Sequence, residues 1–161
     1  MDASKRIDKT FSLKVRLNIS RKVIFYRQEG DFLIKLRYMD IEKIINELSK
    51  KYPGKKIIKN REENPTEIIC EVDPASNHPE KGIAIAVIDK SEPHYHKKTT
   101  EKYKVLKGKL IININGQDYK LQEKEELVIK PGSIHYAIGD ETWVEVYSEP
   151  GWLSEDHILA N

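Results

Sequence analysis

The sequence lacks the features of secreted and membrane proteins. Among its 161 residues there is a single cysteine, Cys70, which excludes a disulfide framework and fits a reducing compartment. No apolar run approaches the ~20 residues of a membrane-spanning helix, and the first ten residues contain no apolar segment of a secretory signal. We therefore expect a cytoplasmic protein with no membrane partner.

The chain also lacks a strong excess of either charge. It has 28 lysines and arginines against 26 acidic residues, a formal net charge of +2. A nucleic-acid-binding domain more often has a large basic excess, so no nucleic-acid partner is expected. The locally basic first 30 residues are interpreted as a solvated face or a guarded sheet edge, with a phosphate-binding arm as the alternative. Abundant lysine, glutamate and isoleucine give a thermophile-like composition.

The remaining composition is that of a soluble globular protein, with 39% hydrophobic and 34% charged residues. The clearest loop is VDPASNHPEKG (72–82), which is rich in proline, asparagine, serine and glycine. Residues 1–73 are predicted to form an extension of strands and one short helix, packed on the second part or on a partner subunit. Residues 74–161 are predicted to form a β-barrel.

In the extension, the helix is expected to begin after Asp40, which can cap it, and to end at Pro53-Gly54. Its apolar stripe consists of Ile41, Ile44, Ile45 and Leu48. Alternating residues predict strands at FSLKVRL (11–17), RKVIFYR (21–27), DFLIKLRY (31–38), KKIIKN (55–60) and EIICEV (67–72), with a turn at 18–20.

The second part consists almost entirely of short strands and turns. Asn115-Gly116 is a hairpin signal, and Pro131-Gly132 marks another tight turn. The predicted strands are IAIAVI (83–88), EKYKVL (101–106), KLIINI (109–114), QDYKL (117–121), ELVI (126–129), HYAI (135–138) and TWVEVY (142–147). This pattern favours a sandwich or barrel. Because 83–88 is apolar on both faces, its outer face needs a cover from the extension or a second subunit, so a homodimer is expected.

Five histidines occur in the chain, and two of them, His94 and His96, share one face of a predicted strand. Glu101 begins the next strand, and its carboxylate would return to the imidazoles if that strand folds back alongside. His135 begins a later strand. Three imidazole nitrogens and one carboxylate oxygen suit one divalent transition-metal ion, Fe, Mn, Co, Ni or Zn.

These residues resemble the cupin superfamily over roughly residues 83–150. The first cupin motif, G(X)5HXH(X)3–4E(X)6G, is matched at His94, His96, Glu101 and Gly108. The second motif, G(X)5PXG(X)2H(X)3N, is matched at Gly132 and His135. The resemblance implies a mostly β fold, a cupin jelly-roll β-barrel to which the N-terminal strand–helix extension is added. It also implies metal ligation by the three histidines and the glutamate.

Four motif positions differ in this chain. The first motif's opening glycine is Ile88, and the second motif has Lys124, Lys130 and Gly139 in place of its first glycine, its proline and its asparagine. These are turn and shape positions, so the departures concern local loop geometry. The four ligand positions are intact.

Candidate catalytic residues follow from alternation around these ligands. Tyr103 shares a face with Glu101. In TWVEVY, Glu145 and Tyr147 share one face, and if that face lines the barrel they could act as general base and acid. The alternative turns the valines of this strand inward and Glu145 to solvent. We interpret the other two histidines, His78 and His157, as surface or core residues.

Three functions are compatible with this site. The first is a metal-dependent enzyme on a small polar molecule, by analogy an isomerase or epimerase of a sugar or sugar phosphate. The second is an iron-dependent dioxygenase, and the third is a non-catalytic module that binds a metal or small ligand. No helix-turn-helix accompanies the barrel, which disfavours a transcription factor.

Overall fold

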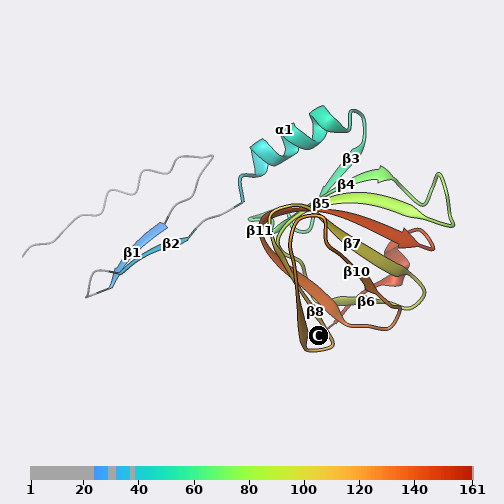
Figure 1. The fold of residues 1–161 in the computed structure, drawn as a ribbon. Helices are drawn as coiled ribbons and strands as arrows, with labels where there is room; N and C mark the ends of the chain where they lie inside the picture. The colour runs from blue at the N-terminus through green and yellow to red at the C-terminus, as the bar shows by residue number, and fades with distance from the viewer. Residues whose placement is uncertain (1–23, 29–31, 37–38, 161) are drawn as a thin grey trace, which may run out of the picture. The chain divides into compact units, whose positions relative to one another are not determined.

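The computed structural model describes residues 24–28, 32–36 and 39–160, and the chain divides into two compact units, 1–37 and 38–161 (Figure 1). In the first unit, β1 (Ile24–Gln28) and β2 (Phe32–Leu36) pair antiparallel, with Tyr26 opposite Ile34. The strands predicted over 21–27 and 31–38 are confirmed in these ranges. The strand predicted over 11–17 and the turn at 18–20 lie outside the described residues.

The second unit contains a curled antiparallel sheet, a helix and a short 3-10 turn. The main path of the sheet is β10-β7-β11-β5-β4-β3. In chain order, the elements of the second unit are α1 (Ile41–Lys51), β3 (Lys56–Lys59), β4 (Glu67–Asp73), β5 (Gly82–Lys90), β6 (His94–His96), β7 (Thr100–Lys107), β8 (Leu110–Ile114), β9 (Gln117–Leu121), β10 (Glu126–Ile129), β11 (His135–Glu149), η1 (Ser154–Asp156) and β12 (His157–Leu159). The predicted mostly β fold with an N-terminal helix is confirmed.

β11 links the two halves of the sheet. Its first residues pair with β6 and β8, and from Trp143 to Ser148 it lies between β5 and β7. The two strands predicted at 135–138 and 142–147 form one strand with a register shift between Ile138 and Thr142. A Cβ at Gly139 would lie 2.6 Å from the Ile88 carbonyl oxygen, so the backbone approaches closely at this bend. Figure 1 shows the curled sheet to which β11 belongs.

Two hydrophobic clusters cover the two faces of β5. On the concave face, Ala86 and Ile88 belong to the barrel core together with Val105, Ile112 and Val144. On the convex face, the cluster contains Ile44, Leu48, Ile68, Cys70, Ile85 and Val87. The cover expected for the outer face of residues 83–88 is therefore the helix of this same chain. A homodimer stays a prediction.

The helix forms over the residues that its capping residue and its apolar periodicity predicted. The Asp40 side chain accepts a hydrogen bond of 3.4 Å from the Lys43 amide, and Ile44 and Leu48 are buried against the sheet. The chain leaves the helix at Tyr52, directly before Pro53-Gly54. Among the described residues, no helix is long and apolar enough to cross a membrane.

Two further comparisons with the sequence concern the domain boundary and the motif departures. The predicted domain boundary lies between residues 73 and 74. β4, before it, pairs with β5, after it, so one sheet contains strands from both predicted parts. The boundary itself stays a prediction. Lys124, which replaces a motif glycine, has a φ of 73°. The turn conformation that glycine favours is thus present with a lysine.

Candidate metal centre

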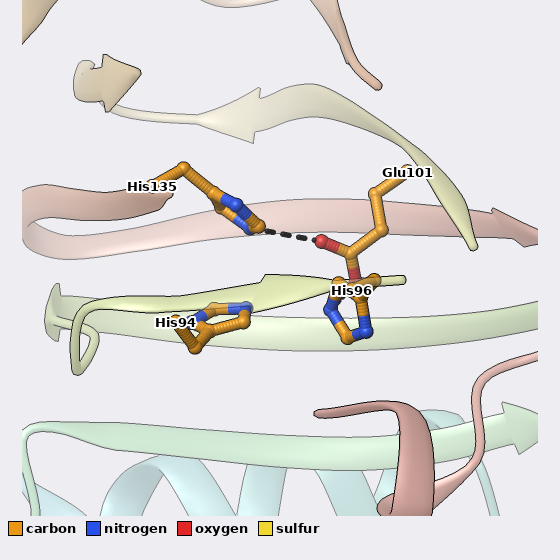
Figure 2. Close-up of side chains that lie close together, drawn as sticks. All are labelled: His94, His96, Glu101 and His135. Carbon is orange, nitrogen blue, oxygen red and sulfur yellow. Dashed lines mark hydrogen bonds and ion pairs between the residues drawn. The ribbon is translucent and has the colours of Figure 1, made fainter. Parts of the chain in front are cut away.

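Strand pairing brings the four predicted ligands together. His94 on β6 lies directly opposite His135 on β11, and Glu101 reaches the same place from the beginning of β7. One ligand atom from each of His94, His96, Glu101 and His135 lies within 4.8 Å of the others, and all four residues are buried. Figure 2 shows the Glu101 carboxylate between the imidazoles of His96 and His135. We call these four residues the ligand cluster.

Backbone carbonyls orient two of the imidazoles. The Nδ1 atom of His94 lies 2.8 Å from the Glu92 carbonyl oxygen, and that of His135 lies 3.0 Å from the Ser133 carbonyl oxygen. A carbonyl oxygen only accepts, so each Nδ1 carries the proton and each Nε2 keeps its lone pair when the ring is neutral. Both Nε2 atoms are therefore available as metal ligands.

The Glu101 carboxylate contacts two imidazoles. Its Oε2 lies 3.1 Å from His135 Nε2, and its Oε1 lies 3.5 Å from His96 Nε2. Burial opposes ionisation of Glu101, but the hydrogen bonds and charges of His135 and His96 outweigh it and hold the pKa of the carboxyl well below its usual range. Glu101 is therefore an anionic donor.

The pKa values of the two β6 histidines move in opposite directions. Burial, reinforced by the His135 charge, lowers the pKa of His94 to about 3. For His96, burial also acts downward, but the hydrogen bond and charge of Glu101, together with the Asp156 charge, raise the net pKa. His94 is thus a neutral donor, whereas the neighbouring carboxylates favour the protonated form of His96.

The surroundings of the two His96 ring nitrogens indicate whether a metal ion fits this site. Both ring nitrogens are buried, and the nearest carboxylate oxygens lie 3.5 Å from Nε2 and 3.8 Å from Nδ1, so neither nitrogen has a well-formed hydrogen bond among the described residues. A buried unsatisfied polar group costs about 1–3 kcal/mol, and a cation beside Nε2 would remove that cost. Three nitrogens and one carboxylate oxygen are also a donor set that divalent transition metals accept. The cluster could therefore hold a metal ion.

Two residues beside the cluster were missed by the sequence reasoning. The Asp156 carboxylate accepts hydrogen bonds of 3.0–3.3 Å from the amides of residues 97, 98 and 99 and lies 3.8 Å from His96 Nδ1. The His157 ring, which was interpreted as a surface or core residue, stacks on His94 with centroids 4.1 Å apart. No motif marks these two neighbouring residues in the sequence. They reach the ligand cluster because β12 pairs with β6, which places His157 opposite His96.

A cavity of about 450 Å³ opens beside the cluster. His94, Glu101 and the predicted Tyr103 line it, and so does Glu67 on β4, which the sequence reasoning did not select. Burial and the charges of Glu101 and Glu92 raise the pKa of Glu67 to about 7. Burial and the charges of Glu101 and Glu67 raise the pKa of Tyr103 well above its usual value, so its hydroxyl stays protonated.

Glu145 and Tyr147 do not join the site. Val144 and Val146 pack in the barrel core, and strand alternation sends Glu145 and Tyr147 to the opposite face. The Tyr147 hydroxyl instead donates to Glu149, at 3.2 Å. The alternative with inward-facing valines is therefore the one observed, which corrects the general base and acid suggested for these two residues.

Comparison with known proteins identifies the fold. No protein-family model matches the chain, and no curated protein matches its sequence. Among solved structures, Pac13 of Streptomyces, a nucleoside dehydratase, is similar with a TM-score of 0.58 and 9% identity, over 67% of this chain and 88% of Pac13. KdgF from Halomonas sp. is similar with a TM-score of 0.51 and 16% identity, over 57% of this chain and 87% of KdgF.

A protein from Klebsiella pneumoniae with a double-stranded β-helix domain has a TM-score of 0.53 and 20% identity, over 63% of this chain and 90% of that protein. At these identities the similarity concerns the fold alone, and reaction and substrate must be argued from the site. The chain has the double-stranded β-helix fold of the cupins, as its two sequence motifs implied.

Proposed function

We propose that this protein is a metal-dependent enzyme that binds a small polar molecule in the cavity and moves a proton on it, as an isomerase, epimerase or dehydratase does. One observation carries the proposal: the four donor atoms of the buried ligand cluster converge within 4.8 Å at the wall of a cavity of about 450 Å³. A cavity of this size accommodates a sugar or nucleoside.

The ligand cluster is proposed to hold Fe, Mn, Co, Ni or Zn. When bound, such an ion supplies Lewis acidity to an oxygen of the bound molecule. His94 and His135 present their Nε2 atoms because backbone carbonyls fix their Nδ1 protons. Glu101 contributes negative charge, since its pKa is held low by the neighbouring histidines despite burial.

Glu67 is proposed as the proton-transfer group and Tyr103 as a hydrogen-bond donor, and both line the same cavity. A carboxyl with a pKa near 7 can release a proton or take one up at neutral pH, as a general acid or base requires. The Tyr103 hydroxyl stays protonated and donates a hydrogen bond to an oxygen of the bound molecule. Pac13, a neighbour in fold, is a nucleoside dehydratase of which variants were solved with uridine, so nucleosides belong among the first compounds to test.

The experiment follows carbon-bound protons by NMR in D2O. Protein loaded with each of the five metals is incubated with a panel of neutral nucleosides and aldoses. Metal-dependent proton exchange or conversion is expected in the parent and is expected to fall at least about a hundredfold in Glu67→Gln, with metal content retained. Glu63→Gln, an exposed glutamate in the preceding loop, is the matched control.

Oxygen consumption with product formation would instead identify the iron-dependent dioxygenase predicted as an alternative. Ligand binding without exchange, conversion or oxygen consumption would identify a non-catalytic binding module. Either result would contradict the proposed proton transfer.

A further inference from the structure

The face of β4 that lines the cavity carries three carboxylates. Ile68 and Cys70 point to the other side, where they pack in the cluster beneath α1. Glu67 and Glu71 alternate with them and line the cavity. Asp73 follows two residues after Glu71, so strand alternation places it on the same side, and it lines the cavity as well. Ile69 is the apolar residue between Glu67 and Glu71 on this face, and the side chains of Glu71 and Asp73 are 22% and 27% exposed, so the acidic side runs from the interior toward the mouth of the cavity.

No lysine or arginine among the described residues lines this cavity. The cations paired with its acids lie outside the lining: Lys56 Nζ is 3.5 Å from Glu71, and Arg61 Nη2 is 3.0 Å from Glu92. Both cations are exposed to solvent, which screens their charge, and neither adds positive charge to the cavity lining. The Glu67 carboxyl has no ion-pair partner within residues 39–160.

This charge distribution disfavours anionic ligands. Phosphates and carboxylates are normally bound by arginine or lysine side chains or by backbone amides at helix ends, and an anion beside like charges is rejected. Hydroxyl groups, in contrast, donate hydrogen bonds to carboxylates. The adjoining part of the wall, on the neighbouring strand β5, is apolar, with Ile83, Ala84 and Ala86, and can cover the carbon face of a ring.

We propose that Glu67, Glu71 and Asp73 make the site selective for uncharged ligands that carry several hydroxyl groups and exclude their phosphorylated and carboxylated analogues. This inference rests on the proposed function, since it assigns the ligand class of the same site. It removes sugar phosphates from the substrates that the sequence suggested and retains neutral sugars, together with the nucleosides added by the comparison with Pac13.

The test compares matched pairs that differ by one phosphate: uridine with uridine 5′-monophosphate, and glucose with glucose 6-phosphate. Dissociation constants are measured by ligand-observed NMR on metal-loaded and metal-free protein. In at least one pair, the neutral member is expected to bind at least about tenfold more tightly than the phosphorylated one.

A charge-neutralised variant, Glu67→Gln/Glu71→Gln/Asp73→Asn, is expected to gain at least about tenfold in affinity for the phosphorylated member. The control is Glu62→Gln/Glu63→Gln/Glu126→Gln, which removes the same charge from exposed positions and is expected to leave both affinities within about twofold. The inference is overturned by equal or tighter phosphate binding in the parent, by an equal gain in the control, or by no binding of any member.

Measuring metal content and ligand preference on the same protein distinguishes a failure of this inference from a failure of the proposed function. Selectivity for the neutral member in a protein that binds no metal would overturn the proposed enzyme and leave the ligand class standing. Full metal loading with preferential phosphate binding would overturn the ligand class and leave the metal centre standing.

Discussion

Replacing Glu67 with glutamine changes the pH dependence of folding in a way that the structure determines. The folded-state pKa of about 7 lies well above the ordinary value of 4.5, chiefly because of burial. The folded protein therefore holds this proton more tightly than the unfolded chain, and unfolding releases it between these two pH values. Stability that is complete below about pH 4.5 is lost as the pH rises through about 7.

The difference between the two pKa values corresponds to about 3 kcal/mol, an upper limit because water in the cavity screens the charge. Glutamine has the same shape and no charge, so Glu67→Gln keeps this stability at every pH. We expect the variant and the metal-free parent to differ little at about pH 4 and the variant to be more stable by up to about 3 kcal/mol at about pH 8.

The assay is urea unfolding of metal-free protein at half-unit pH steps from about 4 to about 8.5, followed by circular dichroism. Glu63→Gln, at an exposed position, serves as the matched control and is expected to track the parent. A difference between Glu67→Gln and the parent that is constant with pH, or a parent that gains stability relative to the variant toward alkaline pH, would refute the reasoning.

Three further predictions concern the parts that position the site. Leu48→Ala, at a fully buried position of α1, is expected to cost about 2–5 kcal/mol in urea unfolding, whereas Leu106→Ala, at an exposed position, costs under about 1 kcal/mol; equal costs would contradict the packing of the helix on the sheet. Asp156→Ala should weaken metal binding about 10–100-fold by calorimetry, because three amides of the loop between His96 and Glu101 lose their acceptor, while the exposed neighbour Glu155→Ala leaves it unchanged. Gly139→Ala should lower the unfolding midpoint through its clash with Ile88, and an unchanged midpoint would show that the bend has room.

The residues of the ligand cluster were predictable because each has a local sequence signal, although His135 joins the others through the long-range pairing of β6 with β11. Two histidines one residue apart on one strand, a glutamate at the beginning of the next and a histidine after a proline–glycine turn are all spacings that sequence displays. The capped helix and most strands were predictable for the same reason. Even the two-sided strand at 83–88 indicated an outer cover, which the structure supplies with α1.

The remaining parts of the site depend on long-range packing. Glu67 belongs to no recognised sequence motif. Its pKa is raised by burial and by the charges of Glu101 and Glu92, and both causes depend on the position of β4 at the cavity. Asp156 and His157 arrive through the pairing of β12 with β6, which lies far earlier in the chain. For Glu145, alternation permitted two orientations, and the packing of Val144 and Val146 in the barrel decided between them.

Metal stoichiometry tests the central claim most directly. Untagged protein, purified without chelator and loaded with Fe, Mn, Co, Ni or Zn, is measured by elemental analysis beside the double variant His94→Ala/His135→Ala and the control His78→Ala, an exposed histidine. We predict one equivalent of metal per chain in the parent and the control, and loss of the metal in the double variant. A parent that retains none of the five metals, or a double variant that retains the full equivalent, would contradict it.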